Sequence, residues 1–229
     1  MLGQRSRLCL LRDMSGGWEE SMELTLRYRG RLPSTGSVRD KQALRLALSP
    51  QLGDFWGRDR RYHHHDLNAL PIARRVKDKI GTDGPIRSMA DCQFRYQLGG
   101  IDFIPLVTDA LQADCALSIR IHRPQDAGSI IYTGGDLDNR LKTLFDALRM
   151  PRDMTELDPK APMANPGPDS GRVFCLLQGD ELITKITIDS KRLLGPPVQP
   201  NEPNYVEMDI DVTILMVTLM AVNSPLLGR

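Results

Sequence analysis

The sequence predicts a small α/β protein of the α+β kind, in which helices flank a mixed β-sheet. Residues 22–29 and 206–214 alternate between apolar and polar side chains, which is typical of half-buried strands. Leucines recur at helical spacing between Leu137 and Leu148, which is typical of a helix with one buried face. The chain has 229 residues, of which 41% are hydrophobic and 26% charged, so it can bury a sizeable core.

The elements expected before residue 130 follow from periodicity and from prolines and glycines. Residues 1–20 contain Gly16-Gly17 and no sustained pattern, so we expect a flexible leader there. The helix that starts at Val38 is expected to end at Pro50, because proline disrupts a helix interior. In chain order the expected elements are a strand over 22–29, helices over 38–48 and 66–80, and strands over 101–107 and 116–122.

The second half of the chain begins with a helix expected over 137–149, which ends before Pro151. Residues 151–172 lack periodicity and exceed the length of an ordinary connection, so this loop is expected to be functional or mobile. Together the elements predict one domain over 21–222 with insertions at about 54–100 and 151–172. Its last strands are expected over 173–178, 183–188 and 206–216.

Cysteine usage and hydropathy limit the class of protein. The four cysteines are far apart and form no C-x-x-C pair, so neither a structural zinc site nor a disulfide framework is expected. The longest apolar stretch, 214–222, is too short to cross a bilayer. We therefore expect a cytoplasmic protein that makes no membrane contact.

The net charge of +1 gives no overall argument for nucleic acid, but arginines crowd the N-terminal third of the chain. Locally basic stretches can bind phosphate backbones even on a neutral protein. A solvated protein surface explains the same residues equally well. The candidates for nucleic-acid binding are Arg27, Arg29, Arg31, Arg58, Arg60 and Arg61.

The strongest chemical signal is the segment Gly135-Asp136-Leu137-Asp138-Asn139, at a junction between a strand and a helix. Two carboxylates one residue apart are costly to bury, because like charges repel and desolvation adds to the penalty. A divalent cation removes both costs, and Mg²⁺ is usually bound by one or two carboxylates together with substrate phosphates. The segment thus favours a metal-dependent enzyme acting on phosphodiesters. An aspartate cap on a solvated helix is the alternative interpretation.

A charged stripe runs along the same helix beside the leucines and consists of Asp138, Lys142, Asp146 and Arg149. Lys142 lies between two carboxylates, where it either balances charge or contacts a scissile phosphate. Asp180-Glu181 follows Gly179 between two expected strands, which is also a common composition for a simple turn. The order of these elements can bring three carboxylates together at one end of a sheet.

Asp136-Leu137-Asp138-Asn139, Lys142, Asp146-Ala147-Leu148 and the later Asp180 together resemble the RusA family of Holliday-junction resolvases. The resemblance implies a small mixed α/β fold and a homodimer that acts on branched DNA. It also implies Mg²⁺, with Mn²⁺ as an alternative ion, bound by Asp136, Asp138 and Asp180. Lys142 would assist cleavage, and Asn139, Asp146 and Glu181 would orient the ligands.

This chain departs from that family in its length, in the long loop over 151–172 and in having Gly179 where the family has an acidic residue. The expected function is therefore a Mg²⁺-dependent, structure-selective DNA endonuclease that hydrolyses phosphodiesters at branched DNA. A RusA-like nucleic-acid-binding or interaction module that has lost cleavage is the alternative.

Overall fold

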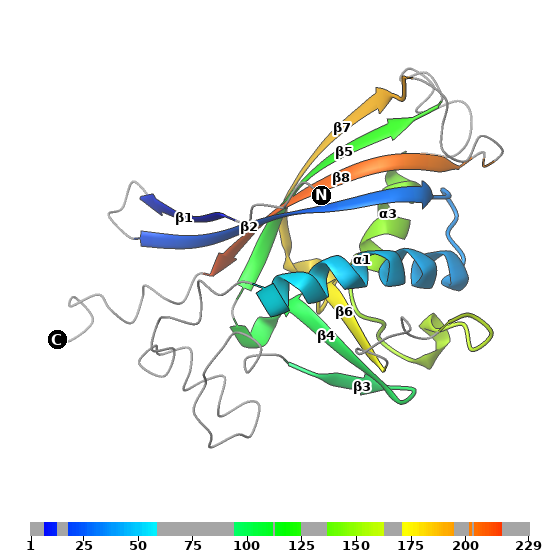
Figure 1. The fold of residues 1–229 in the computed structure, drawn as a ribbon, viewed down its shortest axis with the longest axis horizontal. Coiled ribbons are helices and arrows are strands. Elements are labelled where there is room, and N and C mark those ends of the chain that lie inside the picture. Colours follow the sequence, from blue (N-terminus) through cyan, green and yellow to red (C-terminus); the bar gives the residue numbers. More distant parts are fainter. Residues whose placement is uncertain are drawn as a thin grey trace.

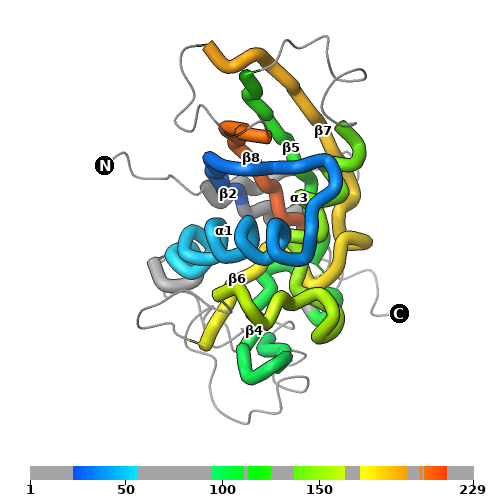
Figure 2. Tube along the Cα trace, turned by 90° about the vertical axis from the view of Figure 1, so that its right-hand side faces the viewer, coloured from blue at the N-terminus to red at the C-terminus, as the bar shows by residue number. Residues whose placement is uncertain are grey.

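The computed structural model describes residues 7–12, 18–58, 94–111, 113–124, 137–162, 171–194, 202 and 204–216. These residues form a mixed α+β fold with two β-sheets, which confirms the expected fold class. Figure 1 shows the larger sheet above helix α1 and the smaller sheet below it, and Figure 2 shows the same order from the side. The helices therefore lie between two sheets rather than flanking a single one.

The large sheet has five strands in the order β1-β2-β8-β5-β7. All its neighbours are antiparallel except β5 and β7, which are parallel. Along β5 buried residues alternate with more exposed ones, as expected for a sheet with one covered face. Its strands are β1 (Arg7–Arg12), β2 (Trp18–Arg31), β5 (Ala113–Arg123), β7 (Ile183–Arg192) and β8 (Tyr205–Met216).

The small sheet has the order β3-β4-β6, with strands β3 (Tyr96–Leu98), β4 (Ile101–Val107) and β6 (Arg172–Leu177). β4 and β6 are parallel and are buried along almost their whole length. Near-continuous apolar runs are typical of parallel strands covered on both faces. All the strands expected from the sequence are confirmed, and β1 and β3 are additional ones.

Helix α1 (Val38–Arg58) begins with a reciprocal cap, in which Ser37 Oγ accepts from the Asp40 amide and Asp40 Oδ2 accepts from the Ser37 amide. It continues through Pro50, so the expectation that it ends there is wrong. The continuation buries Leu52 and brings Gly53 against the ring of Phe174. Tertiary packing thus outweighs the cost of one proline in the helix. The helix expected over 66–80 lies outside the described residues.

The N-terminal residues differ from the expected leader over 1–20, because β1 and the start of β2 lie within it. β1 pairs with β2 from Arg7 opposite Glu23 to Arg12 opposite Trp18. Backbone hydrogen bonds between strands require no side-chain alternation, which explains why periodicity did not indicate them.

Helix α3 (Leu137–Leu148) packs its leucine stripe on the core, as predicted. The main core lies between the large sheet and the helices and extends to Ile104 and Leu176 of the small sheet. The first part of the loop expected over 151–172 covers the other face of the small sheet. There Leu157, just after the 3₁₀ turn η6 (Met154–Glu156), is buried with Phe103. No described helix is long and apolar enough to span a membrane.

Candidate active site

The N-terminal half of α3 carries the exposed part of the predicted site. Asp138 and Lys142 are both exposed, while Leu144 and Leu148 on the same helix are buried. Residues four apart on a helix are neighbours on one face, so the carboxylate and the ammonium are carried side by side on a helix fixed by its leucines. Asp138 Oδ1 accepts a hydrogen bond from the Asn139 amide at 2.7 Å. The side chain of Asn139 is exposed, and the backbone carbonyl of Asn139 accepts a hydrogen bond from Thr143 Oγ1.

Two arginines hold the two ends of α3 in place, Arg45 from helix α1 and Arg140 from α3 itself. Arg45 of α1 donates to the carbonyls of Asp146 (2.7 Å) and Arg149 (3.0 Å), which lie in and just after the last turn. These carbonyls have no partner within a helix, so Arg45 acts as a cap. Arg140, in the first turns, donates to the Leu32 carbonyl and to Asn204 Oδ1. Burial lowers the pKa of Arg45, but the pKa of a free guanidinium is high enough that it keeps its charge.

Asp146 belongs to an ion-pair network that the sequence did not reveal. Its Oδ2 accepts from Lys41 at 2.7 Å and its Oδ1 from Arg149 at 3.1 Å. Arg149 also makes two hydrogen bonds with Glu156, at 2.8 and 2.9 Å. Partial burial raises the pKa of Asp146, but Lys41 and Arg149 outweigh this, and the net pKa lies below its ordinary value. Asp146 therefore joins α1, α3 and the segment after it, rather than facing Lys142.

Asp180 and Glu181 lie in the 3₁₀ turn η7 (Asp180–Leu182), which contacts α3. Asp180 Oδ1 accepts from Arg152 Nη2 at 3.0 Å, with both side chains largely exposed. Glu181 turns back over Gly179, so a side chain at 179 would collide with its carboxylate.

The structure does not show Asp180, in η7, beside Asp138, in α3. Arg152, the partner of Asp180, follows the C-terminal end of the helix, whereas Asp138 lies in its first turn. The described contacts of Asp180 do not include Asp138. Asp136, the third predicted ligand, lies outside the described residues, and within those residues no three His, Cys, Asp or Glu side chains form a group that could hold a metal ion.

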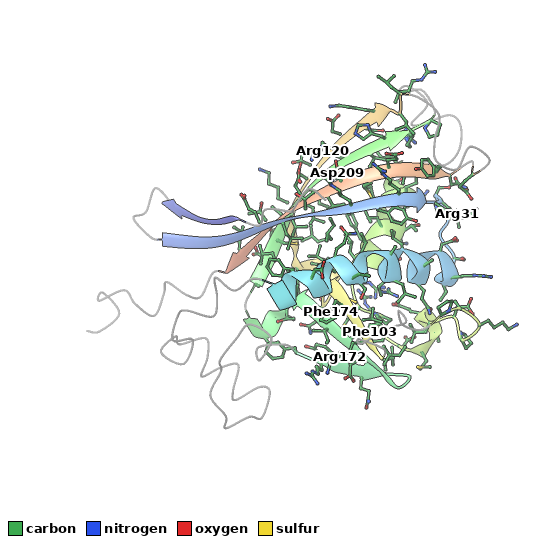
Figure 3. The ribbon with its side chains drawn as sticks, in the orientation of Figure 1. Arg31, Phe103, Arg120, Arg172, Phe174 and Asp209 are labelled. Carbon is green, nitrogen blue, oxygen red and sulfur yellow. The ribbon has the colours of Figure 1, made fainter. Side chains whose placement is uncertain are left out.

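The arginines predicted to bind nucleic acid are partly neutralised where the structure describes them. Arg27 lies 3.5 Å from Asp209, and Arg29 lies 3.3 Å from Glu207, both across the β2–β8 pair. Arg31 pairs with Asp40 and Glu202. Figure 3 shows Arg120 and Asp209 on neighbouring strands of the same sheet. We call this solvent-facing side the open face of the large sheet.

The other three predicted arginines have no described side chain. Arg58 is the last residue of α1 and its side chain is not described, and Arg60 and Arg61 lie outside the described residues. Four residues of this region were not expected from the sequence: Lys41, Arg45, Arg152 and Glu156. Of these, only Glu156 had a local signal, since Asp153-x-x-Glu156 is the pattern of a helix start, and Asp153 does cap η6.

Comparisons with known proteins find no family model, no curated protein and no solved structure that matches this chain.

Proposed function

We propose that the chain is a metal-dependent endonuclease that hydrolyses phosphodiesters in branched DNA. The observation that carries this proposal is the exposed pair Asp138 and Lys142 on adjacent turns of α3. Asp138 belongs to the sequence Asp136-Leu137-Asp138-Asn139, and Lys142 follows one turn later. A carboxylate can hold a cation and the neighbouring ammonium can contact a phosphate bound to it. The buried leucine face and the Arg45 cap fix the helix that carries both groups.

The donor set suits a hard cation. Asp136 and Asp138 would supply carboxylate oxygens, which Mg²⁺ prefers and Mn²⁺ also accepts. Asp180 would join them only after exchanging Arg152 for the ion. A bound ion of this kind supplies charge stabilisation of the phosphodiester and an activated water. Lys142 would neutralise charge that develops on the phosphate, and Asn139 and Glu181 would orient the ligands. Asp146 acts at a greater distance, since its partners Lys41 and Arg149 hold the helix in place.

We further propose DNA with branched structure as the substrate and a homodimer as the active form. Support comes from the motif resemblance and from the exposed guanidinium groups of Arg27 and Arg29 on the open face of the large sheet. The carboxylate partners of these arginines reduce the positive charge of that face. We therefore expect DNA to contact only part of it.

A RusA-like binding module without cleavage is the second candidate. It is favoured by the ion pair between Arg152 and Asp180, because a guanidinium already satisfies one of the proposed metal ligands. Under this proposal Asp180 is a structural partner of Arg152, and metal would not change DNA binding.

The deciding experiment incubates the purified chain with four-way junctions, flaps, duplex and single strands, with Mg²⁺, with Mn²⁺ and with a chelator. Cleavage of a branched substrate that requires the ion supports the nuclease. Asp136→Asn, Asp138→Asn and Asp180→Asn should each abolish cleavage while the chain stays folded, because an amide is a poor ligand for the ion.

Asp102→Asn, at the start of β4 in the small sheet, is the matched control and should keep full activity. Junction binding without cleavage under any ion would support the binding module. Full activity of Asp138→Asn would remove the observation on which the nuclease proposal rests.

A further inference from the structure

Strand β7 ends the large sheet, and within the described residues its outer edge is unpaired. It pairs with β5 along one side from Ile183 to Arg192, and no described strand pairs with its other side. Figure 1 shows it at the upper margin of the sheet. The strand is ten residues long and contains no proline, so its outward amide and carbonyl groups form a continuous row. Such an edge is a template for another strand.

The unpaired edge of β2, in contrast, is covered by a side chain. Where β2 continues beyond its pairing with β1, Gln51 of α1 covers it: Gln51 Oε1 accepts from the Arg27 amide and Gln51 Nε2 donates to the Arg27 carbonyl. A side chain thus satisfies the backbone at that position. Among the described residues, no side chain makes a comparable pair of hydrogen bonds to the backbone of β7.

A row of alternating charge crosses the open face of the large sheet and stops at β7. The residues opposite one another on β2, β8, β5 and β7 are Arg27, Asp209, Arg120 and Asp189. Arg27 lies 3.5 Å from Asp209, and Arg120 lies 3.9 Å from it. Asp189 ends the row, and on its own strand it pairs with Lys191, with both side chains at least half exposed. An exposed ion pair of this kind contributes little free energy, so Asp189 can exchange Lys191 for another cationic partner.

The other face of β7 carries an unusually exposed apolar residue. Ile186 is 43% exposed, although its neighbour Leu117 on β5 is buried. Ile188 lies two residues further on the same face and is half-buried beside Ile119. The apolar layer of the large sheet therefore runs out to the edge strand and is incompletely covered there.

β7 is complementary to itself when it is paired antiparallel about a twofold axis at Thr187. This register places Lys185 opposite Asp189 of a second copy, and Asp189 opposite the copy's Lys185. On the other face each Ile186 lies opposite an Ile188. Directly opposed residues approach to about 5 Å between Cβ atoms, close enough for both pairs to interact.

The neighbouring registers lack this complementarity. An axis at Ile188 places Lys185 opposite Lys191, an axis at Asp189 opposes two aspartates, and an axis at Lys185 opposes two lysines. Like charges directly opposite are destabilising. An axis at Ile186 leaves Lys185 opposite Thr187, without an ion pair. Among the five axes from Lys185 to Asp189, the one at Thr187 continues the alternating charges across the boundary and covers Ile186.

We propose that the outer edge of β7 binds the β7 edge of a second copy of this chain, antiparallel about Thr187, and joins the two large sheets into one. The occupant is another copy because the strand is complementary to its own sequence in both charge and apolar pattern. This inference names the surface for the proposed homodimer but does not depend on nuclease activity, since it is tested by molecular size alone.

The test measures the mass of the full chain in solution by sedimentation equilibrium. The parent chain should be a dimer. Lys185→Asp and Asp189→Lys each create two like-charge contacts across the axis, and each should raise the dimer dissociation constant about tenfold or more. Mixing the two variants restores both opposite-charge contacts, so the mixture should form a heterodimer. The double variant carrying both changes should dimerise with itself for the same reason.

Lys160→Asp is the matched control, because it makes the same charge change on an exposed residue outside β7, and it should remain dimeric. Thermal unfolding of each variant checks that the fold is kept. As a second measurement, Thr187→Cys should form a covalent dimer on mild oxidation, whereas the parent chain should not. A monomeric parent chain, unchanged mass of both charge variants, or no rescue on mixing would overturn the proposal, whether or not the chain cleaves DNA.

Discussion

Glu156→Gln should destabilise the protein by about 2 kcal/mol at neutral pH, because it weakens the ion-pair network around α3. Glu156 accepts two hydrogen bonds from Arg149 and one from the Arg152 amide. The side chain of Arg149 is 6% exposed and that of Glu156 31%, so solvent screens the pair only in part. Hydrogen bonds to charged groups contribute about 1.5–3 kcal/mol each. Glutamine keeps a neutral acceptor and Asp146 still pairs with Arg149, which limits the loss.

The assay is thermal and denaturant unfolding of the parent and the variant. For a chain of this length, a loss of about 2 kcal/mol corresponds to a fall in Tm of about 4–8 °C. Lys191→Gln removes an ion pair whose side chains are 57% and 50% exposed, and serves as the control. Its cost should be below about 0.5 kcal/mol.

The pH dependence of the stability difference between parent and variant tests whether the ionised Glu156 carboxylate is its cause. The hydrogen bonds from Arg149 hold the pKa of Glu156 below its ordinary value, against the effect of burial. A carboxylate with a lowered folded-state pKa stabilises the protein fully above its unfolded value of about 4.3, and this contribution is lost as pH falls through the folded-state value. The difference between parent and variant should therefore be constant near neutral pH and shrink below about pH 4. A difference that is the same at pH 7 and pH 3, or one below about 0.5 kcal/mol, would refute the reasoning.

Three further predictions concern α3, the arginines and α1. Lys142→Ala should lower single-turnover cleavage by about 10²–10³-fold and leave junction binding in gel shifts intact, whereas a rate within a few-fold of the parent would mean that Lys142 only balances charge. DNA affinity should fall with rising salt in binding titrations, but with a shallow slope, because Arg27 and Arg29 already pair with carboxylates; a flat response would exclude both from DNA contact. Pro50→Ala should raise stability by about 1–2 kcal/mol in denaturant unfolding, because Pro50 is exposed within a helix, and a loss of stability would contradict this.

Periodicity in the sequence predicted those helices and strands in which buried positions recur at a regular spacing. The leucines of α3 and the alternation in β5 and β8 each bury one face, and that repeat is visible in sequence. Pro50 shows the limit of such reasoning. Whether a helix continues past a proline depends on what its next turns bury, and the contact of Gly53 with Phe174 joins residues more than a hundred positions apart.

The candidate site was predictable only where it lies on one helix. Asp138 and Lys142 share an exposed face because their spacing of four fixes it. The partners of Asp146 and Asp180 come from other elements, and a sequence pattern does not contain that information. Lys41 therefore replaces Lys142 beside Asp146, and Arg152 rather than a neighbouring aspartate contacts Asp180. The metal site and the nuclease activity remain predictions.

The strand order of the large sheet has a consequence for how the chain folds during synthesis. β8 lies between β2 and β5, yet it is made after both of them. Until Tyr205–Met216 leave the ribosome, β2 and β5 lack the strand that pairs with each of them on that side. Contacts of such long sequence separation form slowly, because the intervening chain must first be brought together. Completion of this sheet therefore waits for β8, and loss of β8 would divide it into two separate pairs of strands.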